Sequence, residues 1–289
     1  MTAIEAAGGP ALRRRRKGRR DRRVALVLPA LALLLAVFAY PVGRLLLRSL
    51  SEPHWGLQNF HALVAQPVFA RALANTVVIS GSVTLICLLA GYPLAYTMAH
   101  ANERWRRLLI FAVLIPFWSS ILVRTFAWLV LLQQRGVINR TLLDLGLVSA
   151  PVTMVHNRVG VLVGMVHILL PFMVLPLYAV MTRIEGSYMQ AAASLGAPPV
   201  RSFLRIYLPL SRPGVINGTV LVFVMGLGYF ITPALLGGPG DTMVAQLIAS
   251  EVSDFGQWGT AGALAVVLLA GVAVTFALLY RTVTPAARR

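Results

Sequence analysis

The sequence predicts an all-α integral membrane protein with six transmembrane helices, both termini in the cytoplasm and a cytoplasmic loop between the fourth and fifth helices. Hydrophobic residues make up 58% of the chain and charged residues only 12%, whereas soluble proteins contain about 25% charged residues. Apolar runs of about 20 residues, the length that crosses a bilayer as a helix, recur along nearly the whole chain. These two observations exclude an ordinary soluble domain.

The N-terminal tail, residues 1–23, contains nine arginine and lysine residues. A basic run of this kind can bind nucleic acid when it stands alone. Here it directly precedes an apolar run, so we expect a cytoplasmic tail that contacts anionic lipid, and no nucleic-acid partner. The apolar run is longer than the core of a signal peptide and lacks a small-x-small cleavage site, which argues against cleavage.

Six apolar runs follow the tail. We expect spans at approximately residues 24–47, 75–98, 108–132, 159–181, 214–236 and 260–280. Together they form a single transmembrane domain over residues 24–282, and a short cytoplasmic tail over 283–289 ends the chain. The connecting segments 49–74, 133–158 and 237–259 are expected on the outer side. In the last of them, we interpret Asp241, Glu251 and Asp254 as ordinary solvated loop charges, with an acidic surface that suits a basic partner as the alternative.

The distribution of basic residues predicts the orientation. With the N-terminus inside, the inner segments hold nine basic residues in the tail, three at 104–107, four at 183–212 and three at the C-terminal end. The outer segments hold six, and Arg124 lies within the third span. Since basic residues favour the cytoplasmic side, both termini and the loop at 183–212 are expected there.

The loop at 183–212 has helix signals of its own. Ser187 followed by Gln190 fits a capping box, and the alanines that follow are strong helix formers. Gly196 favours a left-handed stop, and Pro198-Pro199 can open a second short helix that carries Arg201 and Arg205 and ends near Pro209. We therefore predict two short basic helices joined by a sharp turn, which suggests a docking surface.

Few ionisable residues fall inside the expected spans. None of the nine acidic residues does, and only Arg124 and His167 lie at membrane depth. A secondary carrier usually needs an ionisable group there to bind its coupling ion, so this class is disfavoured. For His167 we expect a hydrogen-bonded packing role in preference to proton relay. Scattered histidines and a single cysteine, Cys87, argue against a metal site and an integral-membrane enzyme.

Lysine usage excludes one source of energy within this chain. A P-loop needs a glycine-rich turn followed by lysine, and the only lysine, Lys17, lies in the basic tail. We therefore expect no ATP site, no cofactor and no enzymatic activity in this chain. If ATP is used, another polypeptide binds it.

One spaced motif and several shorter runs resemble a known family. The run Gln190-Ala191-Ala192-x3-Gly196-x9-Ile206-x-Leu208-Pro209 resembles the E-A-A-x3-G-x9-I-x-L-P loop of binding-protein-dependent ABC importer permeases. It departs only at Gln190, which replaces the glutamate of the motif. Further runs resemble the spermidine/putrescine branch of these permeases: Pro116-Phe117-Trp118, Arg124-Thr125-Phe126-Ala127-Trp128, Gly136-Val137-Ile138-Asn139, Pro171-Phe172-Met173-Val174-Leu175-Pro176 and Leu235-Leu236-Gly237-Gly238-Pro239.

The resemblance implies a multi-pass subunit of an importer in a bacterial inner membrane. Its implied partners are a second, homologous permease subunit that forms a heterodimer, two ATPase subunits and an extracytoplasmic solute-binding protein. The loop would act as the coupling helix seated on the ATPase. Its implied coupling residues are Ser187, Gln190, Ala191, Ala192, Gly196, Arg201, Arg205, Ile206, Leu208 and Pro209.

Polar and aromatic residues in the third and fifth spans are candidates for the translocation pathway. They are Trp118, Ser119, Arg124, Trp128, Asn217, Tyr229 and Thr232. Aromatic rings can hold a polyamine by cation–π contacts, as the resemblance implies. The spans offer no carboxylate to an ammonium group, and Arg124 would repel one. An opine, an amino-acid derivative or another small solute therefore stays open, as does a role for Arg124 in pairing with backbone carbonyls or a partner subunit.

Overall fold

The computed structural model describes residues 28–283. Throughout this range the regular structure is helical, and six stretches are long and apolar enough to cross a membrane: Leu28–Ser51, Pro67–His100, Ile121–Asp144, Arg158–Met181, Pro199–Leu227 and Trp258–Leu278. The predicted all-α fold with six spans is confirmed. The tail expected at 1–23 lies outside the described residues, as do residues 284–289 of the expected C-terminal tail.

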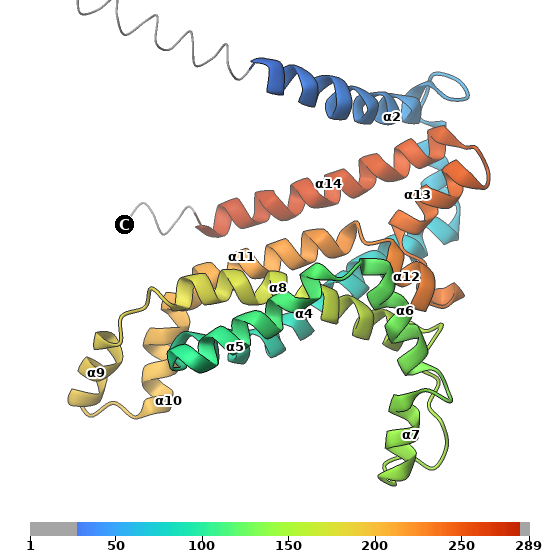
Figure 1. Cartoon of the computed structure of the whole chain (residues 1–289). Coiled ribbons are helices and arrows are strands. Elements are labelled where there is room, and N and C mark those ends of the chain that lie inside the picture. Colours follow the sequence, from blue (N-terminus) through green and yellow to red (C-terminus); the bar gives the residue numbers. More distant parts are fainter. Residues whose placement is uncertain (1–27, 284–289) are drawn as a thin grey trace, which may run out of the picture.

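The helices follow one another along the chain (Figure 1). The first half contains the π-helical turn η1 (Leu35–Ala39), α2 (Tyr40–Ser51), α3 (Gln58–Ala65), α4 (Pro67–His100), α5 (Glu103–Leu114), the 3₁₀ turn η2 (Ile115–Trp118), α6 (Ile121–Leu132) and α7 (Val137–Asp144). The second half contains α8 (Arg158–Met181), α9 (Ser187–Ser194), α10 (Pro199–Ser202), the π-helical turn η3 (Phe203–Tyr207), α11 (Leu208–Leu227), α12 (Ile231–Leu236), η4 (Pro239–Asp241), α13 (Val244–Ser253) and α14 (Trp258–Val283).

Three helices, α4, α8 and α11, form the main core. Ile79 and Val83 on α4, Met165 and Met173 on α8, and Val222 on α11 are fully buried in one cluster. A smaller cluster joins α3, the start of α4, α13 and α14. Helix α2 packs against α14 at the edge of the bundle. Much of the remaining apolar surface of α2, α5 and α6 is exposed, as expected of helices that face lipid or a partner chain.

Small residues let the core helices approach closely. Gly91 on α4 and Gly218 on α11 both face Met173 of α8. A Cβ added at Gly218 would lie 2.7 Å from the Met173 sulfur and 3.1 Å from the Met173 carbonyl oxygen. Because lipid tails are as apolar as the side chains, such close packing is a main source of helix association in a membrane.

The third span is not the single helix predicted at 108–132. Helix α5 ends at Leu114, and the chain passes through η2 and two extended residues, Ser119 and Ser120, before α6 begins. Pro116 opens η2, and Ser119 bonds to the Pro116 carbonyl oxygen through its backbone N–H and its hydroxyl. A proline has no N–H for the helix ladder, and the serine hydroxyl competes for the carbonyl, so the helix stops here.

The second loop helix does not end near Pro209 as predicted. Residues from Pro199 to Leu227 form one continuous helical stretch. The turn η3 widens it locally, with the Leu208 N–H bonded to the Phe203 carbonyl five residues back. This wider turn accommodates Pro209, which would clash with a regular α-helical turn.

The two ends of the bundle differ. Helices α9 and α10 lie at the same end as the start of the first span and the last turn of α14 (Figure 1). Helices α12 and α13 lie at the opposite end, and α7 projects away from the bundle on that side. The chain therefore presents the 187–209 loop at one end and its longest connecting segments at the other.

Replacing Gly218 by alanine tests the close packing of α11 on α8. Gly218→Ala is expected to lower stability by about 1–3 kcal/mol, because the methyl group overpacks against the backbone of α8. Thermal unfolding of the purified protein in detergent measures the loss. Gly271→Ala is the matched control, since a Cβ there meets no atom within 4 Å. Equal thermal unfolding midpoints for both variants and the wild type would show that Gly218 is not needed for close packing of α11 on α8.

Candidate functional site

The capping box predicted at Ser187 and Gln190 is wrong. Gly186, in a helical conformation, is the N-cap of α9, and no side chain caps the helix. The Gln190 N–H donates to the Gly186 carbonyl at 3.1 Å, and the Ser187 hydroxyl donates to Glu185 Oε2 at 3.1 Å. The helix starts one residue earlier than predicted, so Ser187 is already inside its first turn.

The sharp turn after α9 forms as predicted. Gly196 has φ +77°, the left-handed conformation that side chains disfavour. Its N–H donates to the Ala193 carbonyl at 2.9 Å, and the Ala197 N–H donates to the Ala192 carbonyl at 3.0 Å. These two bonds make a Schellman motif. Pro199 then opens α10, also as predicted.

The turn presents an apolar surface to solvent. Tyr188, Ala191 and Leu195 are exposed and share one face of α9, because they are three and four residues apart. Leu195 is 88% exposed and Val200, on α10, is 70% exposed. We call Tyr188, Ala191, Leu195, Val200 and the half-exposed Leu204 the loop surface. Large apolar groups gathered on a protruding loop are typical of an interaction site.

The remaining loop residues divide between this surface and the bundle. Those exposed to solvent are Ser187, Gln190, Gly196, Arg201, Arg205 and Pro209. Ala192 is buried, and Ile206 and Leu208 are half-buried. The two arginines thus place positive charge beside the apolar side chains, and the small Ala192 allows α9 to pack closely on its neighbours.

A cluster of aromatic rings joins the loop to α4. Tyr92, Tyr96 and His100 are each four residues apart on α4, and Phe203 and Tyr207 have the same spacing on η3. Tyr96 contacts both η3 rings edge-on, with centroids 5.8 and 5.0 Å away. This contact was not predicted from the sequence. The four-residue spacing of aromatics at 92, 96 and 100 is the signal that would have indicated it.

A polar cluster lies in the bundle between α6, α8 and α12. Trp128 Nε1 donates to His167 Nδ1 at 3.0 Å, and the hydroxyls of Thr125 and Thr232 are 3.3 Å apart. Because an indole N–H only donates, Nδ1 of His167 accepts and the ring proton sits on Nε2. His167 therefore has the hydrogen bond that the expected packing role requires, and that role stays a prediction.

The structure brings together some of the pathway candidates. Arg124, Trp128 and Thr232 lie on the facing helices α6 and α12, and Tyr229 precedes α12. In the part of the chain that the structure describes, Arg124 Nε and the Tyr229 hydroxyl are buried without a hydrogen-bond partner. Outside this cluster, the exposed residues Trp118 and Ser119 lie at the end of η2, and Asn217 is exposed on α11.

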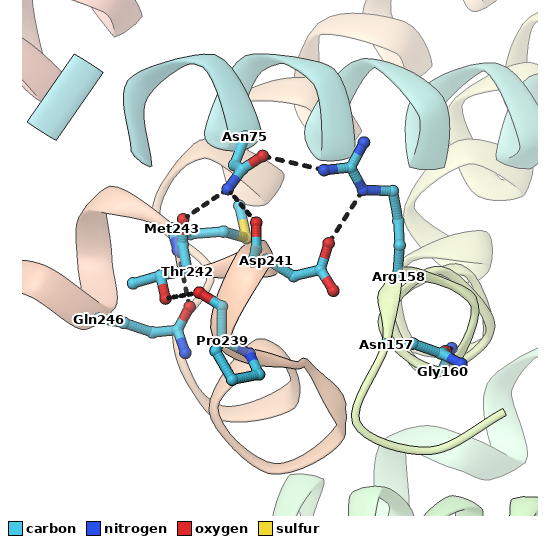
Figure 2. Close-up of polar contacts among 10 residues, drawn as sticks. Asn75, Asn157, Arg158, Gly160, Pro239, Asp241, Thr242, Met243 and Gln246 are labelled. Carbon is cyan, nitrogen blue, oxygen red and sulfur yellow. Dashed lines mark hydrogen bonds and ion pairs between the residues drawn. The ribbon is translucent and has the colours of Figure 1, made fainter. Parts of the chain in front are cut away.

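At the other end of the bundle, a polar network joins α4, α8 and η4 (Figure 2). Arg158, the first residue of α8, donates from Nε to Asp241 Oδ1 at 3.0 Å and from Nη2 to Asn75 Oδ1 at 2.9 Å. Asn75 in turn donates to the carbonyls of Gly240 at 2.7 Å and Thr242 at 3.2 Å. The Asp241 side chain is only 12% exposed.

This network changes the interpretation of the acidic loop. Asp241 is paired with Arg158, and Glu251 is buried on α13, where burial raises the pKa of its carboxyl above the usual range. Only Asp254 of the three is exposed. The loop therefore carries neither three ordinary solvated charges nor an acidic surface, because two of its three carboxyl groups lie inside the fold.

Removing the Arg158 guanidinium tests the polar network of Arg158, Asp241 and Asn75. Arg158→Gln is expected to cost about 1–3 kcal/mol, because it leaves the shielded Asp241 carboxylate and Asn75 without their partner. Arg107→Gln is the matched control: it breaks the exposed pair with Glu103, and such pairs are worth about 0.3–0.5 kcal/mol. Thermal unfolding in detergent measures both. An equal loss in the two variants would show that the network contributes no more than a surface ion pair.

Comparisons with known proteins bear on the same features. The family model described as "Binding-protein-dependent transport system inner membrane component" matches residues 91–289. The spermidine/putrescine transport system permease protein PotB of Haemophilus influenzae is 37% identical over 225 residues, which cover 78% of each chain. PotB of Escherichia coli is 32% identical over 73% of this chain and 77% of its own.

Two solved structures share the fold. A bacterial ABC transporter involved in the import of the acidic polysaccharide alginate has a TM-score of 0.74 and 21% identity, covering 94% of this chain and 99% of its own. A bacterial alginate ABC transporter in complex with an alginate pentasaccharide-bound periplasmic protein has a TM-score of 0.73 and 20% identity, covering 92% and 94%. With its six apolar helices and these relatives, the chain belongs to the family of binding-protein-dependent transport system inner membrane components, the multi-pass permease subunits of ABC transporters in bacterial inner membranes.

Proposed function

We propose that this chain forms part of the translocation pathway of an ATP-driven importer for a small organic solute, and that a separate ATPase drives it through the 187–209 loop. A second, homologous permease subunit completes the pathway as a heterodimer, and an extracytoplasmic binding protein delivers the solute. The loop surface carries this proposal, because it exposes large apolar groups at one end of the bundle. Residues 24–282 would form the single permease domain.

The basic residues support a cytoplasmic location for the loop and both termini. The inner segments hold most of the arginines, and basic residues favour the cytoplasmic side of a membrane. The loop shares its end of the bundle with the start of the first span and the end of α14, so one orientation suits all three. An ATPase in the cytoplasm would then meet the loop surface directly.

The lysine content of the sequence supports an ATPase on a separate chain. Its only lysine is Lys17, so no P-loop is present in the sequence. Force from a separate ATPase would enter through a rigid contact, and the Schellman turn at Gly196 makes the loop compact. Gln190 is exposed on α9. Since it is neutral where the family motif has glutamate, we expect a hydrogen bond with the ATPase at this position in place of an ion pair.

A polyamine is the first candidate for the solute. Two similar permeases are named for spermidine and putrescine. Trp128, in the polar cluster, and Tyr229, which precedes α12, would supply aromatic faces for an ammonium group.

The second candidate is a solute with a carboxylate, such as an opine or an amino-acid derivative. It is favoured by Arg124, whose buried Nε has no hydrogen-bond partner in the described part of the chain. A guanidinium pairs well with a carboxylate and repels an ammonium group.

Transport by the reconstituted complex tests the proposal and separates the two solutes. In proteoliposomes with the partner permease, the ATPase and the binding protein, we expect labelled solute to accumulate only when ATP and the binding protein are both present. Labelled putrescine and a labelled amino-acid derivative are compared under the same conditions. Accumulation by the isolated chain, or accumulation driven by an ion gradient without ATP, would reject an importer permease.

The loop surface can be tested separately by a charge placed at its tip. Leu195→Asp is expected to abolish co-purification of the ATPase, because an unpaired carboxylate would be buried in an apolar contact. Leu145→Asp is the matched control, since Leu145 is 67% exposed and lies beyond α7, at the other end of the bundle. Normal ATPase binding by Leu195→Asp would place the contact elsewhere.

A further inference from the structure

We propose that the aromatic cluster of Tyr92, Tyr96 and His100 on α4 with Phe203 and Tyr207 on η3 is a positioning unit, which transmits movement of the 187–209 loop into the bundle. We call these five residues the ring cluster. The inference rests on the proposed function, since it takes the loop as the point where the force of the ATPase enters. It adds the residues that carry this force onward.

The ring cluster is a continuous set of contacts between two helices. Tyr207 lies 5.0 Å from Tyr96 and 5.4 Å from His100, measured between ring centroids. Phe203 lies 5.8 Å from Tyr96 and 6.2 Å from Tyr92, edge-on to both. Within η3 the two rings stack 5.7 Å apart. Edge-on and stacked pairs at these distances are favourable geometries for aromatic rings.

A hydrogen bond extends the contact by one turn. The hydroxyls of Tyr92 and Ser211 are 2.9 Å apart, and Ser211 Oγ also donates to the Leu208 carbonyl at 2.9 Å. A serine hydroxyl has one proton, so Tyr92 donates to Ser211 and Ser211 donates to Leu208. The side chains of Phe203, Tyr207 and Ser211, each four residues apart, thus all meet α4.

The helix needs external support at this point. The turn η3 replaces regular α-helical bonds with wider ones, and Pro209 follows it without an N–H to donate. Helices bend most readily at π-helical turns and prolines. A push on α10 would therefore bend the helix at η3 and leave α11 in place, unless η3 is held from the side. The ring cluster holds it against α4.

The loop has few other routes into the bundle. Helix α9 packs on α10 and η3, and its buried Ala192 lies on this inner side. The only covalent connection between α9 and α8 is the short segment 182–186. Met189 of α9 also packs against the main core cluster. Movement of the loop surface can therefore pass through that contact, through this segment or through η3, which the ring cluster links to a core helix.

The Tyr207 hydroxyl can be removed without loss of the ring contacts, so its removal serves as a control. Tyr207 is only 2% exposed, and its hydroxyl has no hydrogen-bond partner in the part of the chain that the structure describes. Its ring, and not its hydroxyl, makes the contacts with Tyr96 and His100. Tyr207→Phe should therefore preserve the function of the cluster, whereas Tyr207→Leu should lose it.

The test measures solute transported per ATP hydrolysed by the full complex in proteoliposomes. Tyr207→Leu and Tyr96→Leu should assemble and hydrolyse ATP, but their transport per ATP should fall roughly tenfold, within the usual range of coupling between sites. Tyr207→Phe and Tyr96→Phe should restore the wild-type ratio. Tyr92→Phe removes only the hydrogen bond to Ser211, so it should lower the transport per ATP by a smaller, measurable factor. If the leucine variants fail to assemble, Tyr92→Phe is the variant that tests the inference.

Two results would overturn the inference. One is a wild-type ratio in the leucine variants, or in Tyr92→Phe where those do not assemble. The other is a lower thermal stability of the complex with an unchanged ratio, which would make the cluster a structural contact only. Failure of the proposed function can be distinguished from failure of this inference, because the wild-type complex itself would then show no ATP-dependent uptake.

Discussion

The close approach of α4 and α11 to α8 is the constraint on which the rest of the bundle depends. Both approaches meet at Met173, where Gly91 and Gly218 leave room for its side chain and backbone. In a membrane the hydrophobic effect does not drive helices together, so packing of this kind has to supply much of the association. The three helices then form a rigid centre, to which the loops at both ends are attached.

Helix α4 is the element that both ends share. It has 34 residues and is therefore about 50 Å long, well beyond the hydrocarbon core of about 30 Å. Asn75, in its first turns, bonds to Arg158 and the loop around Asp241. Tyr96, about 30 Å further along the helix, packs on η3. The polar network of Arg158, Asp241 and Asn75 and the ring cluster thus attach opposite ends of the molecule to the same helix, about one membrane thickness apart.

The sequence predicted the features that depend on local chemistry. The six spans followed from apolar runs, and the left-handed turn at Gly196 and the helix opening at Pro199 followed from the conformations that these residues favour. The start of α9 was missed by one residue, because Gly186 takes the cap position without a side-chain bond. The break before α6 and the wider turn η3 depend on how the chain accommodates Pro116 and Pro209, and proline alone does not indicate whether a helix stops or widens.

Contacts between distant segments were beyond sequence reasoning. Asp241 was interpreted as an ordinary solvated loop charge, because its pairing with Arg158, 83 residues away, has no local signal. The ring cluster joins residues more than 100 positions apart in the same way. The pathway candidates form two groups in the structure. Arg124, Trp128, Tyr229 and Thr232 lie near one another, whereas Trp118, Ser119 and Asn217 are exposed elsewhere. The position of a residue in a span and its polarity do not distinguish the two groups.

The central claim is that the loop surface contacts the ATPase, and crosslinking tests it most directly. A photo-crosslinking residue at position 195, compared with one at position 145, is activated in the assembled complex with and without ATP. We predict that position 195 crosslinks to the ATPase subunit and position 145 does not. Crosslinking of the ATPase from position 145, with none from position 195, would contradict the account.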